Sequence, residues 1–257
     1  NDSCTLYLDD LLCFSQTESA HLKIFVEKFV KAGFLLHPLK CQLGKLEVNY
    51  VGYIISNSGW RPKDSNVTAI KEFPIPKTKK MARSFVGMVG FYSNAIPSLV
   101  YNMGPIYAIC GAKTPFEWTE IQQQAFDEAK NLICNNTIMA FPSTEEKHTL
   151  YLTTDSSDLG YGICLTQLTN EGVERSLAFS SGRFRGAMLR WPIRERELYA
   201  LVKGLEIYHV HLYLRKFVWR VDNRSLAYFL SESVIKAEPK RLSQKLLRWL
   251  DFIACYD

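Results

Sequence analysis

The stretch Leu6–Phe14 carries two adjacent carboxylates, Asp9 and Asp10, inside an otherwise apolar run. The apolar residues on both sides have the character of strands, so we expect the pair at a tight turn between two strands. Neighbouring carboxylates repel each other unless a cation compensates, and Mg²⁺ does so through carboxylate oxygens. The alternative is a plain surface turn, where Asp is common. The buried type of the flanking residues favours a metal site.

Length and composition are those of an ordinary globular chain. Its 257 residues are 47% hydrophobic and 22% charged, enough for one large domain or two smaller ones. Neither an apolar run of about 18 residues nor a signal peptide is found, and the seven scattered cysteines never have Cys-x-x-Cys spacing. We therefore expect an intracellular chain with reduced thiols, not secreted and not bound to a membrane. The missing initiator Met indicates a piece of a longer polypeptide.

The positive charge is concentrated in the last part of the sequence. The formal net charge is +5, and residues 148–257 hold sixteen basic and twelve acidic side chains. Five arginines crowd one short segment there: Arg183, Arg185, Arg190, Arg194 and Arg196. Such a cluster attracts phosphate backbones. The alternative is a solvated charged face.

The segment after the carboxylate turn predicts a helix and then a hairpin. Ser15–Glu18 has the form of a capping box, apolar residues follow at helical spacing, and Gly33 is placed to end the helix. Val48–Ser56 resembles a strand, and Asn57–Gly59 is a turn signal, so the second arm of the hairpin should contain Trp60.

Residues 63–147 predict a small helical subdomain. Strand-like runs stop there, and prolines punctuate the sequence. Thr78 is placed to cap a helix whose core face includes Met81 and Phe85, and Thr119–Gln122 has the form of a second capping box.

The sequence from residue 148 predicts an α/β domain with a mixed sheet. The expected strands are Thr149–Thr154, Gly160–Leu165, Arg175–Ser180 and Phe217–Val221. The expected helices are Glu195–His209, Leu226–Leu230 and a last one with Leu242, Leu246, Trp249 and Ile253 on its core face.

Three carboxylates of this domain form a second candidate site. Asp155 and Asp222 end two strands, and Glu197 lies near the start of a helix. Carboxylates placed in this way can converge and hold two divalent ions about 3.5–4 Å apart, the arrangement used for phosphodiester hydrolysis. Spacing alone leaves open that they are ordinary structural acids, and Glu195 competes with Glu197 for the role.

The order of these motifs resembles the polyproteins of gypsy-type (Ty3-like) LTR retrotransposons. Tyr7–Asp10 matches the Tyr-x-Asp-Asp box of reverse transcriptases. Pro74–Thr78, Arg83–Gly87 and Phe116–Thr119 match landmarks of the family's thumb and connection. Thr154-Asp155-Ser-Ser, Arg196-Glu197-Leu-Tyr-Ala-Leu201 and Val221-Asp222-Asn-Arg-Ser match the three acidic motifs of its ribonuclease H, and only Glu197 fits the Glu motif.

The resemblance implies three parts: half a polymerase palm sheet in residues 1–62, a helical thumb and connection in 63–147, and a ribonuclease H-like domain in 148–257. Asp9 and Asp10 would hold Mg²⁺, or Mn²⁺, where the primer 3′ end meets a dNTP. The primer-binding hairpin would be Tyr50, Val51, Gly52 and Tyr53. The catalytic metal ligands for cutting the RNA strand of a hybrid would be Asp155, Glu197 and Asp222, and the backbone contacts Arg183, Arg185 and Arg224.

The implied setting is a cytoplasmic virus-like particle with possible nuclear access. The expected partners are an RNA/DNA hybrid, a template-primer and the rest of the polyprotein. The family's upstream palm Asp and its fourth ribonuclease H acid are not in this sequence. One alternative is therefore an inactive or domesticated derivative that binds nucleic acid. Another, a cellular ribonuclease H with a helical partner, does not account for Tyr7–Asp10.

Overall fold

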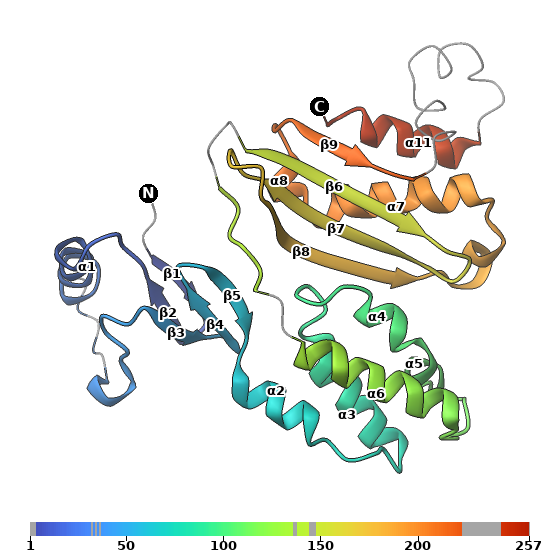
Figure 1. Cartoon of the computed structure of the whole chain (residues 1–257), viewed down its shortest axis with the longest axis horizontal. Coiled ribbons are helices and arrows are strands. Elements are labelled where there is room, and N and C mark those ends of the chain that lie inside the picture. The colour runs from blue at the N-terminus through green and yellow to red at the C-terminus, as the bar shows by residue number, and fades with distance from the viewer. Residues whose placement is uncertain are drawn as a thin grey trace.

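The computed structural model describes residues 4–31, 33, 35, 37–135, 138–143, 148–222 and 243–256. Short hairpins form one end of the molecule, a group of helices lies next to them, and a four-stranded sheet with its own helices forms the third part (Figure 1). The mixed α and β character expected from the sequence is confirmed.

The two acidic residues near the N-terminus lie at the tip of a hairpin, as predicted. Strands β1 (Cys4–Tyr7) and β2 (Asp10–Cys13) pair antiparallel, with Tyr7 opposite Asp10. Leu8 and Asp9 therefore form a two-residue turn. Leu8 has a φ of 51° and is 82% exposed. A left-handed backbone is uncommon for a residue other than glycine.

The cap of the first helix lies two residues later than predicted, at Thr17 rather than Ser15. Helix α1 (Glu18–Phe25) continues as the π-helical turn η1 (Val26–Val30). The side chain of Thr17, rather than Ser15, accepts the hydrogen bond from the Ala20 amide at 3.2 Å. The capping box at Ser15–Glu18 is thus wrong, because Thr17 has the same chemistry and lies directly before the first helical turn. Pro38–Lys40 forms the short 3₁₀ turn η2.

The stretch predicted as one strand at Val48–Ser56 is two strands. β3 (Glu47–Tyr50), β4 (Tyr53–Ser56) and β5 (Gly59–Pro62) form an antiparallel sheet. Val51 and Gly52, with φ of 46° and 80°, make the turn between β3 and β4, so glycine's conformational freedom divides the apolar run. The predicted hairpin whose second arm carries Trp60 is confirmed as β4–β5.

The described residues in the middle of the molecule form five helices, the helical character that the sequence indicated. They are α2 (Asp64–Lys71), α3 (Lys79–Gly90), α4 (Leu99–Asn102), α5 (Gly104–Ile109) and α6 (Glu120–Cys134). Thr78 caps α3 by accepting from the Met81 amide, and the capping box at Thr119 is present in α6. Phe85 and Phe126 pack at 4.5 Å between ring centroids in the core of this group.

The C-terminal sheet has the strand order β8-β7-β6-β9. β6 (Thr149–Ser156), β7 (Gly160–Leu168) and β8 (Glu174–Arg183) are antiparallel, and β9 (Phe217–Arg220) runs parallel to β6. The turn η3 (Gly186–Arg190) precedes α7 (Ile193–Ile207), followed by α8 (His209–Leu212) and later by α11 (Gln244–Ile253). The predicted strands and two of the helices are confirmed, whereas Leu226–Leu230 lies outside the described residues.

The two faces of this sheet differ. Leu150, Leu152 and Thr154 of β6 are buried and point to the face that α7 covers. A Cβ on Gly204 of α7 would lie 3.2 Å from the Leu152 side chain, which shows how closely the helix approaches this face. Because side chains alternate along a strand, Tyr151, Thr153 and Asp155 point to the other face, which we call the open face.

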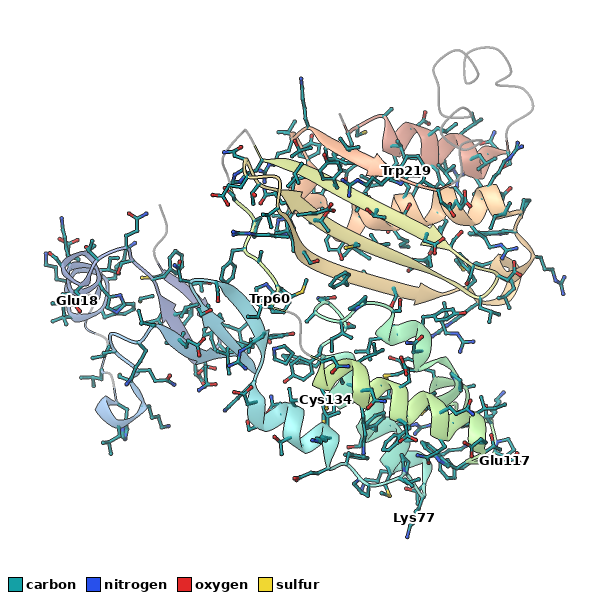
Figure 2. All side chains as sticks on the ribbon, viewed as in Figure 1. Glu18, Trp60, Lys77, Glu117, Cys134 and Trp219 are labelled. Carbon is teal, nitrogen blue, oxygen red and sulfur yellow. The ribbon has the colours of Figure 1, made fainter. Side chains whose placement is uncertain are left out.

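Backbone hydrogen bonds connect the three parts. Trp60 of β5 and Met139 exchange two bonds of 2.8 and 2.9 Å, and the Ala140 amide donates to the Ser176 carbonyl of β8 at 2.8 Å. Met139 and Ala140 belong to the linker between α6 and β6, and Trp60 of β5 lies beside this linker (Figure 2). The linker therefore pairs with a strand of each neighbouring part. None of the helices in the described residues is both long and apolar enough to cross a membrane.

Candidate functional site

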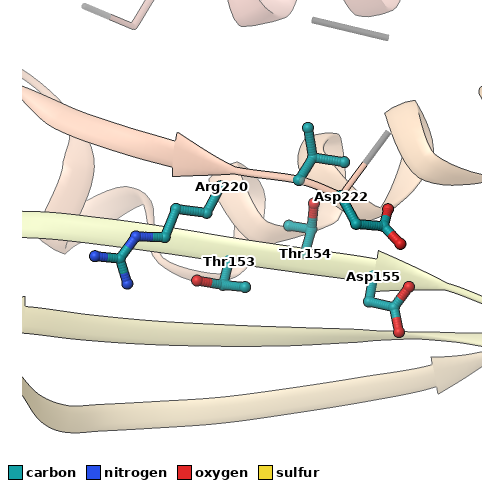
Figure 3. Close-up of a pocket in the computed structure, with 6 residues that line it drawn as sticks. Thr153, Thr154, Asp155, Arg220 and Asp222 are labelled. Atoms are coloured by element: carbon teal, nitrogen blue, oxygen red, sulfur yellow. The ribbon is translucent and has the colours of Figure 1, made fainter. Parts of the chain in front are cut away.

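Two of the predicted carboxylates lie together at the adjoining ends of β6 and β9. These strands pair in parallel, with Leu152 opposite Trp219 and Thr153 opposite Arg220. Continuing this register by two positions places Asp155 opposite Asp222. Both aspartates line a hollow of about 340 Å³, whose other lining residues are Thr153, Thr154, Arg220 and Val221. Figure 3 shows the two carboxylates at the same end of this hollow.

A cross-strand hydrogen bond holds these two strand ends side by side. The indole Nε1 of Trp219 donates to the Thr154 hydroxyl at 2.8 Å. Thr154 is only 2% exposed and directly precedes Asp155, and Trp219 lies three residues before Asp222. Trp219 belongs to the apolar layer between the sheet and its helices (Figure 2). The spacing between the two aspartates therefore depends on a buried contact on the opposite face.

The third predicted carboxylate, Glu197, is positioned by helix α7. It lies on the helix face that packs against the sheet and is 6% exposed. The hollow that Asp155 and Asp222 line does not include Glu197, so the structure brings two of the three acids together. Within the described ranges, no group of three or more His, Cys, Asp or Glu side chains has the arrangement of a metal site. The assignment of these acids as ligands stays a prediction.

The competing acid, Glu195, has a structural partner. Its carboxylate pairs with the ammonium of Lys245 in α11. The same ammonium lies 3.9 Å from the centroid of the Trp191 ring. Glu195 therefore contributes to the packing of α11 against the start of α7.

The sequence did not single out the role of Arg196, which fixes the loop after Asp155. Its guanidinium donates to the Trp191 carbonyl at 2.9 Å, the Ser157 carbonyl at 3.0 Å and the Asp158 carboxylate at 2.5 Å. The side chain is 11% exposed. It thus joins the β6–β7 loop to the start of α7. The sequence signals at Arg196 were its place in the arginine cluster and beside Glu197 in the motif, and neither indicates a contact with this loop.

Arg220 was also missed, because nothing in a short strand distinguishes an arginine that lines a site. Its Cζ lies 3.6 Å from the centroid of the Tyr151 ring, and Nη1 is 2.7 Å from the Glu174 carboxylate. Thr166 also donates to Glu174. Hydrogen bonds from Thr166 and then Arg220 lower the pKa of Glu174. On the same face, burial raises the pKa of the Cys164 thiol to about 11.

The two residues of the N-terminal acidic pair, Asp9 and Asp10, are exposed at their hairpin tip. The second predicted polymerase feature, the Tyr50–Tyr53 turn, is anchored to the end of α3. The Gly52 carbonyl accepts from the Tyr92 hydroxyl at 3.2 Å, and the Tyr53 hydroxyl donates to the Phe91 carbonyl at 3.0 Å. Burial raises the pKa of Tyr53 to about 12, so this phenol stays a hydrogen-bond donor.

The three arginines predicted to contact a nucleic-acid backbone have different surroundings. Arg183 donates to the Gly104 carbonyl at 2.8 Å and thereby joins β8 to the helical group. A Cβ on Gly104 would lie 2.6 Å from the guanidinium, so glycine leaves room for this contact. Arg185 is exposed, and Arg224 lies outside the described residues.

Comparisons with known proteins agree with the motifs. Residues 118–219 match the family described as the RNase H-like domain found in reverse transcriptase. The match begins before residue 148, where the sequence predicted a domain boundary. The Pol polyprotein of transposon 297 from Drosophila melanogaster is 30% identical over 94% of this chain and 23% of its own length. The Tf2-3 polyprotein of Schizosaccharomyces pombe is 25% identical over 96% of this chain and 18% of its own length.

Solved structures show the same fold. The foamy viral protease-reverse transcriptase in complex with an RNA/DNA hybrid has a TM-score of 0.77 and 20% identity, and the match covers 97% of this chain and 34% of that chain. The complex of that protein with dsDNA has a TM-score of 0.76, with 97% of this chain and 52% of that chain covered. The chain spans less than a quarter of the length of the transposon 297 and Tf2-3 polyproteins. It is a homologue of gypsy-like retrotransposon Pol polyproteins and contains an RNase H-like domain of the reverse transcriptase type.

Proposed function

We propose that the sheet β6–β9 and helix α7 cut the RNA strand of an RNA–DNA hybrid. The observation that carries this proposal is the placement of Asp155 and Asp222 at adjoining strand ends in one hollow. Buried Glu197 on the covering helix is the third acid of the site. The match of residues 118–219 to RNase H-like domains supports the same reaction.

The residues fit a site for divalent ions. Carboxylate oxygens are the donors that Mg²⁺ and Mn²⁺ prefer, and Asp155, Glu197 and Asp222 would hold the ions. Adjoining carboxylates such as Asp155 and Asp222 repel each other at close range unless a cation compensates. When bound, the ions would activate the attacking water and stabilise the leaving oxygen.

The chain's own residues would hold the site and select the substrate. The Trp219–Thr154 hydrogen bond fixes the spacing of the two strand ends, and Arg196 fixes the loop after Asp155. An A-form hybrid is distinguished by its shape and its 2′-hydroxyl groups rather than by base sequence. Exposed Arg185 is available for a backbone phosphate, as Arg224 would be.

The hairpins at the other end would belong to a polymerase palm, with residues 63–147 as thumb and connection. Asp9 and Asp10 would serve primer extension with a dNTP within a longer polyprotein. Tyr50–Tyr53 would contact the primer. Leu8 and Val51, at the two hairpin tips, both have a left-handed backbone. Backbone strain of this kind is concentrated at functional sites, which supports a role for both turns. The setting would be a virus-like particle.

The test is cleavage of a labelled RNA–DNA hybrid by the full chain in Mg²⁺ and in Mn²⁺. We expect Asp155→Asn and Asp222→Asn to abolish cutting, because each removes an oxygen charge from the hollow. Glu197→Gln should do the same. Glu171→Gln is the matched control, since it neutralises an exposed acid in the β7–β8 turn of the same sheet.

The outcomes separate the proposal from its alternative. Cutting that persists in Asp155→Asn would place the nuclease elsewhere. Binding of the hybrid by every variant, with no cutting by any, would favour an inactive nucleic-acid-binding derivative. The relatives are transposon polyproteins, so the comparisons do not favour that alternative.

A further inference from the structure

Arg220 is a cation that is held in one orientation on the open face beside the proposed nuclease site. Its guanidinium stacks on Tyr151 at 3.6 Å and pairs with Glu174 at 2.7 Å. Glu174 is itself held by a hydrogen bond from Thr166. Ordering a long side chain in advance removes part of the entropy cost of binding a ligand. Arg220 is therefore preorganised, yet its side chain remains 40% exposed.

The contact with Glu174 leaves Arg220 able to bind an anion. A guanidinium has five N–H donors, and the bond to Glu174 is made through Nη1. An exposed ion pair contributes little stability, so pairing alone is a weak reason for such an arrangement. A phosphate, by contrast, accepts two charge-assisted bonds from a planar guanidinium. The alternative is that the cluster only packs the open face.

The spacing along strand β6 gives the approximate separation between the guanidinium and the carboxylates. Figure 3 shows Arg220 extending along the sheet, away from Asp155 and Asp222. It stacks on Tyr151, which lies four residues before Asp155 on the same strand. At about 3.3 Å per residue this is about 13 Å. Phosphates of one strand of duplex DNA recur about every 3.4 Å along the axis, and at a similar spacing in the hybrid the span corresponds to about four phosphates.

We propose that Arg220, oriented by Tyr151 and Glu174, binds a backbone phosphate of the RNA strand within about four phosphates of the bond that is cut. This inference rests on the proposed nuclease function. The cut strand must pass the hollow that Asp155, Asp222 and Arg220 line together, and a neighbouring phosphate of that strand can then reach the guanidinium. Such a contact positions the strand without reading its bases.

The experiment compares the full chain with Arg220→Gln and Arg220→Lys. The control is Lys216→Gln, which removes an exposed cation just before β9, outside the hollow. Hybrid binding is measured against salt in an Asp155→Asn background, and cleavage kinetics are measured without that change. We expect Arg220→Gln to raise KM about tenfold with little change in kcat, because one charge-assisted contact is lost. The slope of log affinity against log salt should fall by about one. Arg220→Lys should retain the slope and part of the affinity.

A scan of the substrate backbone makes the test specific. A single neutral methylphosphonate is placed at successive linkages of the RNA strand of the hybrid, with a 2′-O-methyl group beside it to keep the linkage intact. One position within about four linkages of the cut should weaken binding by the wild-type chain and leave Arg220→Gln unaffected. Equal sensitivity of both proteins at every position would overturn the proposal. So would a loss of kcat or of thermal stability in Arg220→Gln with an unchanged salt slope, since that is the result of a purely structural role. If the wild-type chain binds with the predicted slope difference but never cuts, the nuclease proposal fails and the phosphate contact stands.

Discussion

Breaking the hydrogen bond between Trp219 and Thr154 should loosen the two strand ends that carry the aspartates. The bond is 2.8 Å long, and its acceptor is 2% exposed. A hydrogen bond contributes about 0.5–1.5 kcal/mol net, and a buried group left without a partner raises the cost to about 1–3 kcal/mol. Trp219→Phe should therefore destabilise the β6–β9 pair by about 2 kcal/mol, part of which reflects the smaller ring. Thr154→Val removes the acceptor and should cost about 1 kcal/mol.

The assay is native-state hydrogen exchange of the β6 and β9 amides, because it reports local opening in a chain with several parts. The double variant should cost less than the sum of the two single variants, by a coupling energy of about 1 kcal/mol. Thr149→Val is the matched control, the same substitution on the opposite face at the other end of β6. Cutting by Trp219→Phe should fall by about tenfold or more, since small misplacements of reacting groups are costly. Strictly additive single effects would refute the claim that this bond holds the strand ends.

Two further predictions concern the loop after Asp155 and the pH dependence of stability. Arg196→Gln should lower kcat for hybrid cutting with KM unchanged, because two backbone carbonyls lose their donor. Asp158→Asn is the milder change at the same contact. Its side chain is 88% exposed, so it should lower the free energy of unfolding by less than about 1 kcal/mol. Burial, and then the charge of Arg215, lower the pKa of His211. Neutral His211 therefore adds stability above the unfolded-state pKa of about 6.5, and this is lost as pH falls through the lower folded-state pKa. Urea midpoints at about pH 7.5 and about pH 5.5 should thus differ more in the wild type than in His211→Gln.

Local signals in the sequence predicted much of the fold. Thr78 and Thr119 were placed correctly as helix caps, because capping depends on atoms within one helical turn. The same rule failed at Ser15, since Thr17 offers an equivalent hydroxyl closer to the first helical turn. The local pattern missed the division of Val48–Ser56, because a glycine inside an apolar run has no local sign of its φ value. The family resemblance did place a hairpin at Tyr50–Tyr53.

The site could be predicted only in part, because its geometry depends on residues far apart in the sequence. That Asp155 and Asp222 end strands was readable from the pattern, but their adjacency depends on the parallel register of β6 and β9. Glu197 belongs to a third element, helix α7, and its burial depends on how that helix packs against the sheet. Arg220 takes its role from Tyr151, 69 residues earlier. No local pattern records such a pairing.

The two proposed sites differ in what holds them. Asp155 and Asp222 lie at the ends of two strands that are anchored by a buried hydrogen bond and by the apolar layer of Leu152 and Trp219. Asp9 lies in a hairpin whose neighbouring residues, such as Leu8, are largely exposed. Segments with few buried contacts open at a smaller free-energy cost than a core does. The geometry of the proposed nuclease site is therefore determined by this chain's own core, whereas the acidic turn relies on little beyond its hairpin among the described residues. A perturbation of the C-terminal sheet should consequently change cutting directly, while the acidic turn depends on whatever else contacts its exposed surface.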